Sequence, residues 1–203
     1  MPKPTVEQIR GLMRAQKYED YIVSDTQSFP HCLPLNPDAV QPQQERGEKP
    51  NAFFERYKTW AKNNLTAEGQ RLYDRANQSV PAGLSARPGT NTARTFVNSR
   101  SETTKAKSSE CSNFARHAIG TLIQHKDITD HYNIVYAGIM GGAHNIAILV
   151  PKDQKLPLVQ GLGAAPTLRG DQLPKGSLFI DPWSLGMGND FNSSFGCTKA
   201  PRC

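Results

Sequence analysis

The segment Cys111–Ile123, with the sequence CSNFARHAIGTLI, has the apolar spacing of an α-helix. Its apolar residues recur at i, i+1, i+4, i+5 and i+8, which places them on one helical face (Phe114, Ala115, Ala118, Ile119 and Leu122). Cys111 would lie in the first turn, with Ser108 or Ser109 as the capping residue. Because a helix N-terminus has unpaired N–H groups and a partial positive charge, it stabilises a thiolate. Cys111 is therefore a candidate nucleophile.

Two β-prone segments follow this helix. One covers Tyr132–Ile139 and the other Ala143–Val150, and the Gly141-Gly142 pair between them predicts a hairpin. His144 stands at the head of the second segment, which is otherwise apolar. A lone histidine there is usually structural, but its position next to a helix that carries a thiol makes it a candidate base.

A third strand is predicted over Leu178–Ile180, and it ends in Asp181. An Asp before Pro is often a turn initiator, although its carboxylate can also orient a histidine ring. His144 follows Cys111 by 33 positions and Asp181 follows His144 by 37. In such a set the thiolate attacks, the imidazole accepts and returns the proton, and the carboxylate fixes the imidazole tautomer.

Three motifs, Cys111–Ala115, His144–Ile148 and Ile180–Trp183, together resemble the transglutaminase-like branch of the papain-like cysteine enzymes. The resemblance covers about residues 105–185. It implies Cys111 as nucleophile, His144 as base and Asp181 as the orienting carboxylate. It also implies an α+β fold with a papain-like or transglutaminase-like core, in which the catalytic helix packs on an antiparallel sheet preceded by N-terminal helices.

This chain departs from the family pattern in two respects. The interval between His144 and Asp181 is longer than usual, and we expect a flap within it, at Lys152–Gly176. The backbone N–H of Cys111 can supply one hydrogen-bond donor of the oxyanion hole. The sequence shows no clear match for the side chain that supplies the second donor. Candidate neighbours of the site are polar or aromatic residues close to the motifs or on the same helix (Asn113, Gln124, Asn145 and Trp183).

The resemblance implies a cysteine-dependent acyl-transfer enzyme that acts on a host protein. Glutamine deamidation or transglutamination through a Cys111 thioester is the leading hypothesis, and a cysteine protease with the same residues is the first alternative. A papain-like peptidoglycan amidase or endopeptidase is a second alternative, since Glu110-Cys111-Ser112 resembles the start of that group. A non-enzymatic binding protein with an inert thiol is a third. By analogy, the chain is a bacterial virulence effector or toxin that a specialised secretion system delivers into the reducing host cytosol.

The remaining segments suggest one compact domain. Residues 1–80 are predicted to form a helical part that could select the target. Within it, Thr5 and Gln8 make a capping box, Asn51–Asn63 forms a helix, and another helix starts near Thr66. The aromatic stripe of the second helix (Phe53, Tyr57 and Trp60) is predicted to be core. Residues 80–110 are expected to form a long loop, residues 105–185 the catalytic core, and residues 186–203 a Gly/Ser-rich tail.

Composition narrows the function classes. The 203 residues contain 24 Lys and Arg and 18 Asp and Glu, and the formal net charge of +6 is spread over mixed-charge segments, which argues against nucleic-acid binding. No apolar run approaches the roughly 20 residues of a membrane span, and the first residues lack the apolar core of a Sec signal. The four cysteines contain no CxxC pair, so we expect no metal and no cofactor. Cys197 and Cys203 could pair under oxidising conditions.

Overall fold

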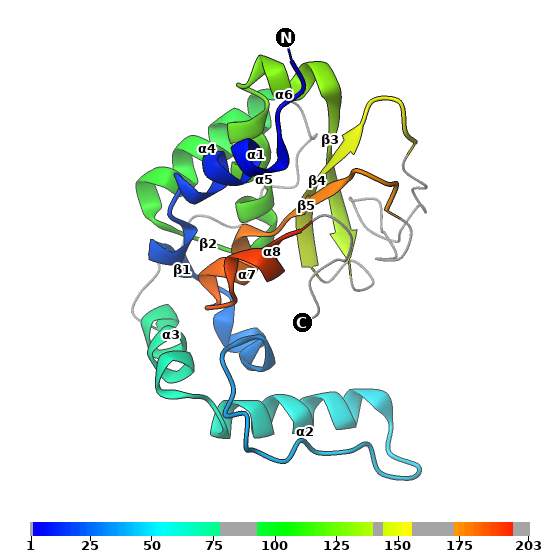
Figure 1. Ribbon diagram of the computed structural model, residues 1–203. Coiled ribbons are helices and arrows are strands. Elements are labelled where there is room, and N and C mark those ends of the chain that lie inside the picture. Colours follow the sequence, from blue (N-terminus) through cyan, green and yellow to red (C-terminus); the bar gives the residue numbers. More distant parts are fainter. Residues whose placement is uncertain (1, 78–92, 140–143, 156–172, 197–203) are drawn as a thin grey trace.

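The computed structural model describes residues 2–77, 93–139, 144–155 and 173–196 and mixes helices with strands (Figure 1), which confirms the α+β class. The helices are α1 (Val6–Arg14), α2 (Pro50–Asn63), α3 (Ala67–Asn77), α4 (Ala93–Ala106), α5 (Cys111–Leu122), α6 (Lys126–His131), α7 (Pro182–Gly186) and α8 (Phe191–Ser194). Short 3-10 helices lie between α1 and α2 (η1, Tyr18–Asp20; η2, Thr26–Ser28; η3, Pro30–Cys32). The strands are β1 (Ile22–Val23), β2 (Ser108–Ser109), β3 (Tyr132–Ile139), β4 (His144–Pro151), β5 (Leu178–Ile180) and β6 (Phe195–Gly196).

The main sheet is antiparallel, with the strand order β3-β4-β5-β6. Strands β3 and β4 pair along their whole length, from Tyr132 opposite Pro151 to Ile139 opposite His144, which confirms the predicted hairpin. Its Gly141-Gly142 connection lies outside the described residues. Apart from its second residue, β4 is buried throughout, as its almost continuous apolar sequence indicates.

Helix α5 packs against one face of this sheet (Figure 1). All of its residues after Cys111 are buried, and Phe114 and Ile119 share the main core with Leu149 of β4. The preceding strand residue, Ile148, belongs to a separate cluster on the other face, because successive side chains of a strand alternate between faces. This packing fixes the start of α5 relative to the sheet residues that follow in the sequence.

Two predictions about the N-terminal helices have different outcomes. The capping box of α1 is confirmed, since the Gln8 N–H donates to Thr5 Oγ1 at 3.2 Å and the Thr5 N–H donates to Gln8 Oε1 at 2.8 Å. The prediction that the aromatic stripe of α2 is core is wrong. Phe53, Tyr57 and Trp60 are half-buried and stack on one another, at ring-centroid distances of 6.1 Å and 5.5 Å. Helix α2 lies apart from the sheet (Figure 1), so its aromatic face is covered only in part.

The expectation of a long loop over residues 80–110 is wrong for its second half, which forms α4 and β2. Helix α4 packs so closely on α5 that a Cβ on Gly120 would lie 2.4 Å from the carbonyl oxygen of Phe96. Ser108 and Ser109 do not cap α5, because they pair in parallel with Ile22 and Val23 of β1. The N-cap is Glu110, and its side chain makes no capping bond.

The expected C-terminal tail also contains regular structure. Helix α8 and strand β6 lie within it, β6 pairs with β5, and Phe195 is buried in the main core. Sequence composition misses this because the segment has few apolar residues and several Gly, Ser, Asn and Asp residues, while a short edge strand needs few apolar residues. Most of the predicted flap and both Cys197 and Cys203 lie outside the described residues. In the described part of the chain, no helix is long and apolar enough to cross a membrane.

Candidate active site

Cys111 is the first residue of α5 and has a partly exposed side chain. The chain enters the helix directly from β2, whose parallel pairing with β1 holds the entry in place. The sulfur is therefore located at a helix N-terminus, next to the first residues of β4. Placement at the end of a buried helix allows the thiol to be held rigidly and still be reached from solvent.

His144 and Asp181 come from neighbouring strands of the sheet. His144 begins β4, Asp181 directly follows β5, and these strands pair with Ala147 opposite Ile180. His144 Nε2 lies 2.8 Å from Asp181 Oδ2, and the two side chains are 5% and 0% exposed. The other carboxylate oxygen, Oδ1, accepts the backbone N–H of Ser184 at 3.1 Å, so Asp181 is also the N-cap of α7. Asp181 thus starts a turn and contacts the histidine ring as well.

The charge of Asp181 determines the protonation of His144. Burial alone would lower the pKa of His144, but the charge and hydrogen bond of Asp181, together with the hydrogen bond and charge of Cys111, raise it to about 11. A ring held in this way favours the imidazolium form, which is the partner that a thiolate needs. The physical origin is a fully buried carboxylate at hydrogen-bonding distance, which attracts the ring's positive charge more strongly than solvent would.

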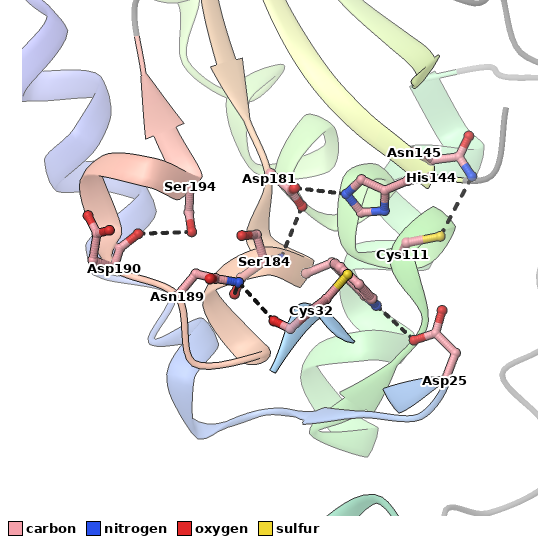
Figure 2. Close-up of polar contacts among 11 residues, drawn as sticks. Asp25, Cys32, Cys111, His144, Asn145, Asp181, Ser184, Asn189, Asp190 and Ser194 are labelled. Carbon is pink, nitrogen blue, oxygen red and sulfur yellow. Dashed lines mark hydrogen bonds and ion pairs between the residues drawn. The ribbon is translucent and has the colours of Figure 1, made fainter. Parts of the chain in front are cut away.

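Two side chains lie next to the sulfur of Cys111. One is His144, which holds Asp181 with Nε2 and whose pKa the neighbouring Cys111 helps to raise. The other is Asn145, whose Nδ2 lies 3.8 Å from Sγ (Figure 2). A thiol, an imidazole and a carboxylate from three distant segments are therefore neighbours, with a hydrogen bond between the imidazole and the carboxylate. Such an arrangement can generate a nucleophilic thiolate and can carry a proton to a leaving group.

Trp183 and Asp25 complete the surroundings of these residues. The ring of Trp183 packs against that of His144 with centroids 4.6 Å apart, and its Nε1–H donates to Asp25 Oδ1 at 2.8 Å. Burial raises the pKa of Asp25, and the hydrogen bond from Trp183 and the nearby backbone of Cys111 oppose this rise. Sequence reasoning missed Asp25. It lies in an N-terminal segment without a recognisable motif, and parallel strand pairing brings it to the site.

The candidate neighbours separate into two groups. Asn145 and Trp183 contact the predicted residues, as described above. Asn113 is buried in the first turn of α5, where its Oδ1 accepts a bond from Arg116 at 3.4 Å. Gln124 is misplaced by the prediction: it lies beyond the other end of α5, about 20 Å along the helix from Cys111, and its amide donates to the carbonyl of Gly120. The buried face of α5 extends over its whole length, so periodicity alone could not separate its two ends.

The histidine of α5 itself has a structural environment. His117 is fully buried between the Tyr18 hydroxyl, 2.8 Å from Nδ1, and the Thr104 hydroxyl, 2.9 Å from Nε2. Burial, and then the positive charges of Arg100 and Lys107, lower the pKa of His117 to about 4. Within the described ranges, no group of three or more His, Cys, Asp or Glu residues could hold a metal ion.

Comparison with known proteins identifies the family. A family model described as the RavJ peptidase domain matches residues 8–201. The chain belongs to this family. It is also similar to a solved structure, the N-terminal fragment of an uncharacterized protein from Legionella pneumophila, with 26% identity and a TM-score of 0.60. That similarity covers 97% of this chain and 82% of the other. No curated protein matches. The findings support a bacterial effector enzyme of the peptidase type.

Proposed function

We propose that this member of the RavJ peptidase family is a Cys-His-Asp thiol enzyme that transfers the acyl group of a host-protein glutamine. The observation that carries the proposal is the hydrogen bond of His144 with the buried Asp181, at 2.8 Å, in a ring that neighbours Cys111. A structural histidine has no need of a partly exposed thiol as its second partner. The start of α5 against an antiparallel sheet also supports the transglutaminase-like core that the sequence motifs imply.

The proposed reaction has two halves. First, the Cys111 thiolate forms a bond to the carboxamide carbon, and the C–N bond then breaks as ammonia leaves with a proton from His144. The product of this half is a thioester. In the second half, His144 removes a proton from water, which attacks the thioester and releases glutamate with the free thiol. A lysine amine in place of that water gives a crosslink instead.

A peptidase is the second candidate, and the family description favours it. The same three residues would attack a main-chain amide, and the leaving group would be a new N-terminus in place of ammonia. The two reactions share every step at Cys111 and His144. They differ in which amide the binding surface presents to the sulfur.

The partner and the location follow from the same proposal. The substrate is a host protein, and the enzyme reaches it after delivery into the host cell by a specialised secretion system. The Legionella relative supports a bacterial source for this type of protein. A protein that works in a reducing cytosol keeps Cys111 as a thiol, which the proposed chemistry requires.

The test captures the substrate with the Cys111→Ala variant and then treats it with wild-type protein. Mass spectrometry of the treated substrate is expected to show a Gln-to-Glu change or a Gln–Lys crosslink that Cys111→Ala does not produce. The matched control is Cys32→Ala, which removes the buried cysteine of η3 and should keep the activity. New N-termini in place of altered glutamines would favour the peptidase. An unmodified substrate, together with a thiol no more reactive than in denatured protein, would contradict both candidates.

A further inference from the structure

Arg116 carries a buried positive charge in the middle of α5. It is only 7% exposed, its Nε has no hydrogen-bond partner, and its Nη1 reaches only the Oδ1 of Asn113, at 3.4 Å. Among the described residues Arg116 forms no ion pair, and the carboxylate of Glu110 instead accepts the Ser112 hydroxyl at 2.8 Å. A buried guanidinium is normally paired with an acid, because burial removes its hydration. Arg116 therefore has the environment of a group that binds an anionic ligand.

The ring of Tyr136, on β3, faces this guanidinium. Arg116 Cζ lies 5.5 Å from the ring centroid, within the range of a cation–π contact. The Tyr136 side chain is partly exposed, and its hydroxyl makes no hydrogen bond to the described part of the chain. Burial, opposed by the charge of Arg116, raises the pKa of Tyr136 to about 12, so the hydroxyl keeps its proton at neutral pH. A guanidinium and a phenol thus offer N–H and O–H donors at one place.

This pair lies near Cys111, on the side away from Asp181. Arg116 is about 7.5 Å along the helix axis from Cys111. Its contact with Asn113 shows that its side chain runs back toward the start of the helix. In the sheet, β3 and β5 lie on the two sides of β4. Asp181 follows β5, whereas Tyr136 belongs to β3, the outer strand of the described sheet. A substrate segment that meets the sulfur can therefore extend toward Tyr136 and Arg116 without passing Asp181.

We propose that Arg116 and Tyr136 form a subsite that binds the carboxylate of an acidic side chain next to the reacting amide of the substrate. This inference rests on the proposed thiol acyl transfer and adds a preference for acidic residues around the reacting one. The guanidinium presents a pair of N–H groups to the two carboxylate oxygens, and the Tyr136 hydroxyl donates from the more exposed side. The net charge of +6 attracts acidic segments in general, whereas this local site selects among them.

The test measures how Cys111 reacts with two probes that differ in one carboxylate. N-iodoacetyl-β-alanine carries a carboxylate several bonds beyond its reacting carbon, and N-iodoacetyl-β-alaninamide carries a neutral amide at the same place. With both probes the sulfur bonds to the CH2 carbon and iodide leaves. The ratio of the acid rate to the amide rate therefore cancels differences in thiol reactivity. Both rates are followed at Cys111 by peptide mass spectrometry.

We expect Arg116→Met to lower this ratio about tenfold, because the charge-assisted hydrogen bonds to the carboxylate are lost. Arg116→Lys should lower it less, because an ammonium keeps the charge without the paired donors. Tyr136→Phe keeps the ring against Arg116 and removes only the hydroxyl, and should lower the ratio about threefold. This third variant tests the subsite even where Arg116→Met does not fold.

The matched control is Arg71→Gln, which removes a positive charge paired with Glu68 at 2.6 Å on the surface and should leave the ratio unchanged. The proposal is overturned if folded Arg116→Met or folded Tyr136→Phe leaves the ratio unchanged, or if Arg71→Gln lowers it as much as Arg116→Met. A wild-type thiol that alkylates no faster than in denatured protein would instead overturn the underlying function.

Discussion

Replacing Asp181 with Asn tests the charge at the centre of the site while leaving its shape almost intact. The carboxylate of Asp181 has two hydrogen-bonded neighbours, His144 Nε2 at 2.8 Å and the Ser184 N–H at 3.1 Å, and an amide can offer an accepting oxygen to one of them only. A carboxylate this close raises a histidine pKa by about 1–3 units. Each unit is tenfold in the ratio of charged to neutral ring. The variant should therefore lower the ratio of imidazolium to imidazole about 100-fold.

The titration of the His144 ring, followed by NMR, reports this ratio. Because the pKa of His144 is about 11 in the wild type, the ring is charged at pH 7, and we expect the midpoint of its titration to lie about 1–3 pH units lower in Asp181→Asn. The control is Asp130→Asn, which removes a carboxylate paired with Lys126 at 2.7 Å on the surface, and its midpoint for His144 should not change. Equal midpoints in folded Asp181→Asn and wild type would refute the idea that Asp181 controls the protonation of His144.

Four other substitutions test the surrounding structure. The folded chain keeps His117 neutral down to a pKa of about 4, whereas the unfolded chain binds this proton below 6.5. The free energy of unfolding, measured by urea titration, should thus fall by about 3 kcal/mol between pH 6.5 and pH 4 in the wild type. The fall should be much smaller in His117→Gln, and an equal fall in both proteins would contradict this explanation. Gly120→Ala should destabilise the protein by about 1–3 kcal/mol, because its Cβ would meet a backbone oxygen of α4 at 2.4 Å. Gly11→Ala, with nothing within 4 Å, should stabilise it slightly in the same denaturation assay. Asn145→Ala should slow the alkylation of Cys111 about three- to tenfold through loss of the amide at 3.8 Å, and an unchanged rate would exclude that contact.

Local patterns predicted the elements that carry the three reactive side chains. The helix from Cys111, the hairpin that includes His144 and the strand before Asp181 all match the structure to within one residue. These segments are long or strongly apolar, so their periodicity reflects the face that they bury. The same reasoning failed for α4, whose composition resembles a loop. Its stability depends on close packing against Gly120, which no window of sequence can reveal.

Contacts between distant segments could not be predicted in the same way. Asp25 and Cys111 are far apart in the sequence, and β1 and β2, which bring them together, are too short to show a strand pattern. Gln124 was placed near the site because it follows the same helix, although helix length carries it to the opposite end. The Asp-Pro sequence left two roles open for Asp181, as a turn initiator or as the partner of a histidine. The structure shows both, because one carboxylate oxygen contacts His144 and the other accepts the N–H of Ser184.

The sequence alone determined which segments are helix and strand around the site, and which residue types could perform thiol chemistry. Those properties are local, since they depend on the spacing of apolar residues and on the identity of single side chains. Tertiary structure alone decided that His144 lies between Cys111 and Asp181, and that Trp183 donates a hydrogen bond to Asp25. The physical reason is that hydrogen bonds and charge interactions act over a few ångströms in space, whereas the groups that make them are separated by many residues along the chain.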